Sequence, residues 1–138
     1  MTITFTVPGR PQGKGRPRFS RGHTYTPPKT VNYESLIKNC YLLHGGVKLE
    51  GAVRLRILAL YPIPKNTKAA ERRLMIEGSI LPTKKPDGDN IEKVVADALN
   101  GTAYDDDSQI VTAYWEKLYA ADREHVGLVV TISNEDLA

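Results

Sequence analysis

The chain has 138 residues, of which 41% are hydrophobic and 25% are charged, a composition typical of one globular domain and not of a disordered chain. Its single cysteine, Cys40, excludes an intramolecular disulfide and a thiolate metal cluster, and it favours a reducing, cytoplasmic setting. There is no apolar run of about 18 residues and no signal-peptide pattern, so we expect neither membrane insertion nor secretion.

The net charge is only +3, but the charges are unevenly distributed along the chain. Seven of the sixteen acidic residues fall between residues 87 and 107. No acidic residue precedes Glu34, whereas all of the following basic residues do: Arg10, Lys14, Arg16, Arg18, Arg21 and Lys29. One small domain therefore combines a cationic segment with an anionic cluster.

The predicted elements begin with a strand over residues 2–7, where β-branched and aromatic residues alternate with a period of two. Glycine and proline then predict a mobile, basic surface loop over about 9–29. Hydrophobic periodicity predicts the remaining elements: an amphipathic helix from Thr30 to Gly45-Gly46, a strand over 53–61, helices over about 66–76 and 89–99, and strands over 110–120 and 126–133.

Five residues, four of them polar, separate the last two predicted strands, which predicts that these strands form a hairpin. The order of the elements indicates an α+β fold, in which a mixed β-sheet is covered by helices. No repeat or linker divides the chain, so we expect a single domain over residues 1–138.

The first acidic cluster, Asp87-Gly-Asp89-Asn90, lies where a loop enters the helix predicted over 89–99. Asp89 and Glu92 resemble a capping box at the start of this helix. An extended backbone would point Asp87 and Asp89 the same way, with about 7 Å between their Cα atoms. Two such carboxylates could bind one Mg²⁺ or Mn²⁺ ion, which prefer hard oxygen ligands and accept phosphate oxygens as well.

Asp89, Lys93 and Asp97 are spaced four residues apart and share the polar face of the same predicted helix. At about 1.5 Å per residue, Lys93 lies about 6 Å along the axis from Asp89, and Asp97 lies about 12 Å from it. We therefore assign Lys93 to the candidate site and Asp97 to a structural role.

The second acidic cluster, Asp105-Asp106-Asp107, precedes the strand that is predicted from Ile110. Strand alternation would send Asp105 and Asp107 to one side and Asp106 to the other, so the pattern alone does not choose among them. Their mutual repulsion favours a nearby cation. The alternative for both clusters is that the aspartates only cap a helix and form a solvated turn, where aspartate is common.

The run DGDNIEKVVADAL over residues 87–99, followed by DDSQI over 106–110, resembles the RusA family of Holliday junction resolvases. The shared pattern is Asp-x-Asp-Asn, a lysine three residues after the asparagine, an Asp-Ala-Leu helix end, and an Asp-Asp pair before a small residue, glutamine and an aliphatic residue. By this resemblance Asp87, Asp89 and Asp107 correspond to catalytic, metal-binding aspartates, and Lys93 to the active-site lysine.

The resemblance further implies Mg²⁺ (with Mn²⁺ possible) as cofactor, a homodimer, and paired symmetric cleavage of four-way DNA junctions in recombination and repair. It implies a phage or prophage type of enzyme in the cytoplasm of a bacterial or phage-infected cell. The resemblance is strongest over residues 84–111, and residues 11–18 look like the basic arm of phage-type members.

Basic residues near these segments are the predicted contacts to DNA phosphates, because cationic side chains release counterions from DNA: Arg10, Lys14, Arg16, Arg18, Lys84 and Lys85. The alternative is that the arm is merely solvated. Phe19, Tyr25 and Tyr33 could stack on exposed bases, although aromatic residues more often serve packing.

Two other functions compete with a junction nuclease. In a non-catalytic protein that binds branched DNA, the acidic residues would serve as caps and as ion-pair partners of the basic arm. A metal-dependent phosphohydrolase of small nucleotides would not need the arm.

Overall fold

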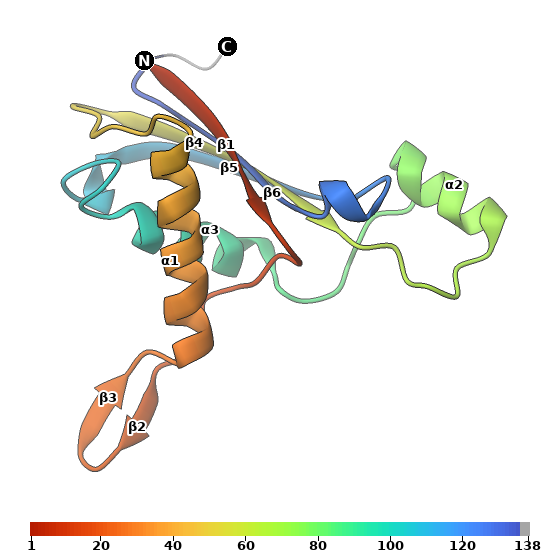
Figure 1. Ribbon diagram of the computed structural model, residues 1–138, viewed down its shortest axis with the longest axis horizontal. Coiled ribbons are helices and arrows are strands. Elements are labelled where there is room, and N and C mark those ends of the chain that lie inside the picture. The colour runs from red at the N-terminus through yellow and green to blue at the C-terminus, as the bar shows by residue number, and fades with distance from the viewer. Residues whose placement is uncertain (136–138) are drawn as a thin grey trace.

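A four-stranded mixed sheet forms the base of the molecule in the computed structural model, which describes residues 1–135 (Figure 1). β6 is antiparallel to both of its neighbours, and β5 is parallel to β4. In spatial order the strands are β1 (Thr2–Pro8), β6 (Gly127–Ser133), β4 (Val53–Tyr61) and β5 (Ile110–Tyr119). The predicted α+β class with a mixed sheet is confirmed.

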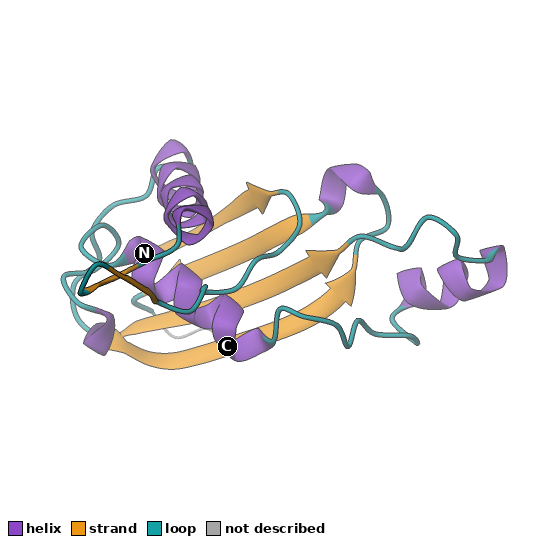
Figure 2. Ribbon diagram, turned by 90° about the horizontal axis from the view of Figure 1, so that it is seen from below, coloured by secondary structure: helices purple, strands orange, loops and turns teal. Residues whose placement is uncertain are grey.

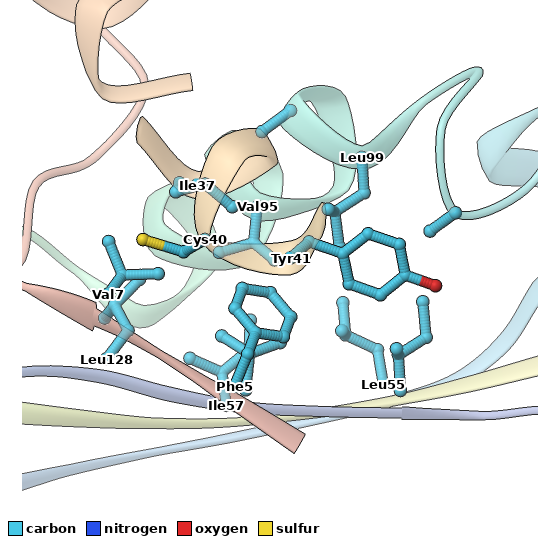
Figure 3. Close-up of a cluster of buried hydrophobic side chains, with 14 of the residues drawn as sticks. Phe5, Val7, Ile37, Cys40, Tyr41, Leu55, Ile57, Val95, Leu99 and Leu128 are labelled. Atoms are coloured by element: carbon cyan, nitrogen blue, oxygen red, sulfur yellow. The ribbon is translucent and has the colours of Figure 1, made fainter. Parts of the chain in front are cut away.

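Two helices, α1 (Pro28–Leu43) and α3 (Gly88–Leu99), cover one face of this sheet (Figure 2). Their apolar faces have the predicted helical spacing and point to the sheet (Figure 3). The ring of Phe5 on β1 meets the ring of Tyr41 on α1 edge to face, with 5.4 Å between centroids. The helices supply these buried residues to the core: Tyr33, Ile37, Cys40, Tyr41, Ile91, Val94, Val95, Ala98 and Leu99.

The third helix, α2 (Ala69–Glu77), stands apart from the sheet at the end of a long connection (Figure 1). None of its residues is buried, although Leu74 and Ile76 are apolar. It ends at Gly78, whose φ of +87° is the left-handed conformation that favours glycine. Among residues 1–135, no helix is long and apolar enough to cross a membrane.

The predicted hairpin between the last two strands is wrong, because β4 lies between β5 and β6. β4 has a buried residue at every second position and a hydrogen-bonded neighbour on each edge, so it is a central strand of the sheet. The segment 120–126, which contains a short 3₁₀ helix, η2 (Arg123–His125), therefore steps across the end of β4. Two strands that flank a third are about 10 Å apart, so a tight turn could not join them.

The prediction of a mobile loop over 9–29 is also wrong in part, because the base of this segment is anchored. The backbone N–H of Lys14 donates to the carbonyl of Asn90 on α3, with 3.3 Å between N and O. The backbone N–H of Gly15 donates to the hydroxyl of Thr30 on α1 at 3.0 Å. Beyond this base the chain forms a two-stranded hairpin of β2 (Arg18–Ser20) and β3 (His23–Tyr25).

Candidate active site

Helix α3 begins with Asp87 as its N-cap, and the Asp87 carboxylate accepts a hydrogen bond from the backbone N–H of Asn90 at 3.3 Å. Asp89 therefore lies in the first turn of the helix. The expectation that an extended backbone points Asp87 and Asp89 the same way is wrong, since residues two apart in a helix face different sides. The capping box predicted for Asp89 and Glu92 is also wrong, because Asp87 and not Asp89 is the N-cap of the helix.

Gly88, between these two carboxylates, packs directly against the indole of Trp115 on β5. A Cβ atom at Gly88 would lie 2.2 Å from two ring atoms of Trp115, far inside van der Waals contact. Only glycine lets the start of α3 approach the sheet this closely. The contact fixes the position of both neighbouring aspartates relative to β5.

The polar face of α3 and the start of β5 enclose a hollow of about 460 Å³, here called the acidic hollow. It brings together three of the four predicted catalytic residues, Asp89, Lys93 and Asp107. The remaining residues that line it are Glu92, Ala96, Asp97 and Ile110.

The structure gives different partners to the three adjacent aspartates. The Asp105 carboxylate forms an ion pair with Lys48, with 2.9 Å between Oδ1 and Nζ, on the open surface. Asp106 caps the short 3₁₀ helix η1 (Asp107–Gln109), and hydrogen bonds from Ser108 hold the pKa of Asp106 below its ordinary value. Of the three, Asp107 alone lines the acidic hollow.

Gln109 ties this acidic turn to the segment that leads into β4. Its side-chain amide donates to the carbonyls of Leu49 and Gly51, at 3.2 and 2.9 Å. Its side-chain oxygen accepts the backbone N–H of Asp105 at 2.8 Å. These three bonds fix the direction in which the turn presents Asp107.

Tyr104 lies buried behind the acidic turn, and its hydroxyl donates to the carbonyl of Ala96 on α3. Burial raises the pKa of Tyr104, and the negative charges of Asp107, Asp97 and Asp106 raise it further. A phenol whose ionisation is suppressed by surrounding carboxylates indicates a negative potential around the hollow. The sequence did not single out Tyr104, because it lies in the turn after the predicted helix and belongs to no hydrophobic repeat.

The donor set of the acidic hollow suits a hard cation. Mg²⁺ usually binds one or two carboxylates together with water and phosphate oxygens, and Asp89 and Asp107 supply two carboxylates in one hollow. Asp87 is not among the lining residues. Within residues 1–135, no three His, Cys, Asp or Glu side chains lie close enough together to hold a metal ion. The chain thus brings together two of its three predicted metal ligands, with Lys93 beside them.

A second and larger hollow of about 760 Å³, here called the basic groove, runs along the anchored arm. Asp87 and Asn90 at the start of α3 form part of its wall. Lys84, one of the six predicted phosphate contacts, does not line it. The other five do, together with Lys29, which the prediction omitted: Arg10, Lys14, Arg16, Arg18 and Lys85.

Lys14 differs from the other cations of the basic groove because it has protein partners. Its Nζ lies 2.8 Å from a carboxylate oxygen of Asp97 and 3.3 Å from one of Glu34, and its side chain is 22% exposed. Burial alone would lower the pKa of Lys14, but the two carboxylates outweigh it and raise the pKa above 10.5. Asp97, predicted to be structural, thereby joins the acidic hollow to the arm.

Tyr61 and Lys117, at the ends of β4 and β5, hold the segment that precedes Asp87. The Tyr61 hydroxyl donates to the carbonyl of Pro86 at 2.7 Å, and Lys117 donates to the carbonyl of Lys84 at 2.6 Å. The Lys117 ammonium lies 5.1 Å from the centroid of the Tyr61 ring. Sequence reasoning missed both residues, because only the parallel pairing of β4 with β5 brings them together.

Comparison with known proteins identifies related sequences over most of the chain. The sequence model of the family described as Endodeoxyribonuclease RusA matches residues 8–133, a range that contains both the basic groove and the acidic hollow. The chain is also 33% identical over 127 residues to a Bacillus subtilis (strain 168) protein described as "Uncharacterized protein YqaN", and the match covers 87% of this chain and 89% of that protein.

Proposed function

Because the chain belongs to the RusA family of endodeoxyribonucleases, we propose that it resolves Holliday junctions by paired, symmetric, Mg²⁺-dependent cleavage of four-way DNA in recombination and repair. Family membership makes the chain a nuclease. The proposal adds the junction as substrate, the metal, and the residues that act on them.

The selective placement of Asp107 carries this proposal. Asp105 pairs with Lys48 and Asp106 caps η1, while Asp107 faces Asp89 and Lys93 across the acidic hollow. An acidic turn that served only as a solvated connection would have no reason to place one carboxylate in the same hollow as another, on the helix that also borders the cationic groove.

In this proposal Asp89 and Asp107 hold the metal ion, while Asp87, which lines the basic groove at the start of α3, lies beside the bound DNA. When bound there, Mg²⁺ supplies Lewis-acid activation of a water molecule and of the scissile phosphate. Lys93 is exposed on the same wall of the hollow and neutralises charge that develops on the phosphate. The indole of Trp115 keeps the aspartates of α3 at a fixed distance from β5.

The basic groove binds the phosphate backbone. Arg10, Arg16 and Lys85 are exposed, and cationic side chains contribute sequence-independent affinity by releasing counterions. Lys14 supports them indirectly, because its ion pairs fix the arm to α1 and α3.

Cleavage of a synthetic four-way junction tests the proposal. We expect Asp107→Asn to abolish Mg²⁺-dependent symmetric nicking while junction binding is retained. The matched control, Asp105→Asn, removes an equal charge two residues away and should cleave within a few-fold of wild type, because its side chain pairs with Lys48 on the surface. Equal rates for the two variants, or binding by wild type without nicking, would overturn the assignment.

Paired incision requires two active sites, and we propose a homodimer as their source. β5 is an edge strand of the described sheet, and two of its apolar residues, Val111 and Tyr114 on opposite faces, are 57% and 50% exposed. Such an edge is a ready surface for a second chain. α2, which buries none of its residues, is a further unpaired surface. Sedimentation equilibrium measures whether the protein is a dimer at the concentrations at which it cleaves.

A further inference from the structure

The β2–β3 hairpin projects from the end of α1, away from the sheet and its core (Figure 1). Its two-residue turn, Arg21-Gly22, has positive φ at both positions, +51° and +80°, as a type I′ hairpin turn requires. Every residue from 16 to 26 is exposed. The hairpin therefore contributes nothing to the buried core, and its sequence is free of the demands of packing.

Phe19 is the most conspicuous residue of this hairpin, with 75% of its surface exposed. It pairs across the strands with Thr24, so these two residues share one face of the ribbon. Arg18 and Tyr25 form another pair and lie on the opposite face. On its face of the hairpin the phenyl ring therefore has Thr24 as its cross-strand neighbour, which leaves most of the ring uncovered.

The charge around Phe19 indicates what kind of molecule covers it. Arg18 and Arg21 flank it, and no acidic residue occurs in the first 33 residues of the chain. Arg16 and Arg18, at the base of the hairpin, also line the basic groove, so the groove continues into the hairpin. A polyanion with exposed aromatic faces matches this surface, and nucleic acid with unstacked bases is such a molecule.

We propose that Phe19 is a stacking finger, which binds the exposed face of an unpaired or unstacked base and thereby favours branched over continuous duplex DNA. In a continuous duplex each base is covered by its neighbours, whereas bases at a branch point or in a single strand offer a free face. This inference rests on the proposed function for the identity of the substrate, and it adds the element that selects it.

Binding measurements with three DNAs of related sequence test the finger: a four-way junction, a linear duplex and a single strand, all without Mg²⁺. We expect Phe19→Ala to weaken binding to the junction and the single strand by about 5- to 150-fold, the range for loss of one base–aromatic stack. Duplex affinity should stay within about two-fold, and the salt dependence should not change, because no charge is removed.

Three further variants separate base stacking from a purely hydrophobic contact and from a general effect of altering the hairpin. Phe19→Trp should retain the preference for the junction and the single strand over the linear duplex. Phe19→Leu should lose this preference, because leucine keeps apolar area but has no aromatic face. Thr24→Ala, on the same face of the hairpin, is the matched control and should bind like wild type. All variants should keep the wild-type melting temperature, because the hairpin buries no side chain.

The outcomes distinguish this inference from the proposed function. Unchanged binding by Phe19→Ala, an equal loss for junction and duplex, or full recovery with Phe19→Leu would overturn the finger. A Phe19→Ala variant that changes the oligomeric state would also overturn it, since Phe19 would then contact a second copy. If wild type binds junctions through Phe19 but never cleaves them, the finger stands and the proposed nuclease reaction fails.

Discussion

Replacement of Gly88 by alanine tests whether the contact between α3 and β5 sets the geometry of the carboxylates. The added Cβ would lie 2.2 Å from the Trp115 ring, about 1.2 Å inside the closest ordinary carbon–carbon contact. The contacted atoms belong to the fused part of the indole, which cannot bend away by a simple rotation of a flexible end. Either α3 or the indole must therefore move by about 1 Å.

The size of the effect follows from this displacement. Overpacking of this kind costs about 1–3 kcal/mol, and the better helix propensity of alanine offsets about 1 kcal/mol. We expect a net loss of about 1 kcal/mol of stability, or about 4 °C in Tm for a chain of this size. Cleavage should fall more steeply, by about 100-fold, because a shift of 1 Å in catalytic groups has that effect.

Thermal denaturation and junction nicking on the same preparations measure the two effects. The double variant Gly88→Ala/Trp115→Ala makes room for the methyl group, so it should recover activity relative to Gly88→Ala, with Trp115→Ala alone as control. If Gly88→Ala cleaves at the wild-type rate, or if removal of the indole brings no recovery, the contact does not position the site.

Two further predictions concern the basic groove and pH. Arg16→Gln should reduce the slope of log affinity against log salt by about 0.9, the contribution of one phosphate contact. Lys14→Gln should instead lower Tm and leave this slope unchanged, because Lys14 is ion-paired within the protein. Equal slopes for the two variants would contradict this prediction. Burial raises the pKa of Tyr33 from its ordinary 10 to about 12. As pH rises, the unfolded chain therefore loses the Tyr33 proton before the folded protein does. The free energy of unfolding should consequently fall between pH 10 and pH 12, by up to about 3 kcal/mol. Urea denaturation across this range should reveal a shallower fall for Tyr33→Phe, and an unchanged pH dependence would refute the assignment.

Elements with a clear hydrophobic period were predictable from the sequence. The spacing of Tyr33, Ile37 and Tyr41 defines the buried face of α1, and the same rule placed Asp89 and Lys93 together on the polar face of α3. These are local properties, in which the backbone geometry alone decides which side chains share a face. The axial distance of Asp97 from Asp89 follows from the same geometry, but helical spacing did not predict that Asp97 also lines the acidic hollow and pairs with Lys14.

Contacts between distant segments were not predictable in this way. The hairpin expected for the last two strands failed because hydrophobic alternation says which face of a strand is buried and not which strand lies beside it. Likewise Asp105 differs from Asp107 through its ion pair with the distant Lys48, and Gln109 holds the acidic turn through the distant carbonyls of Leu49 and Gly51. The family resemblance had singled out Asp107, and the structure supplies a physical difference between it and its neighbours.

Helix α3 explains how one short segment can serve both surfaces of the molecule. Asp87 and Asn90, at its start, face the basic groove, while Asp89 and Lys93, on another side of the same turns, face the acidic hollow. The ion pair between Lys14 and Asp97 ties the arm of the groove to the wall of the hollow. DNA bound along the groove would therefore pass the start of α3, the helix whose other side lines the acidic hollow. A displaced arm should consequently impair cleavage as well as affinity, although no arm residue lies among the carboxylates.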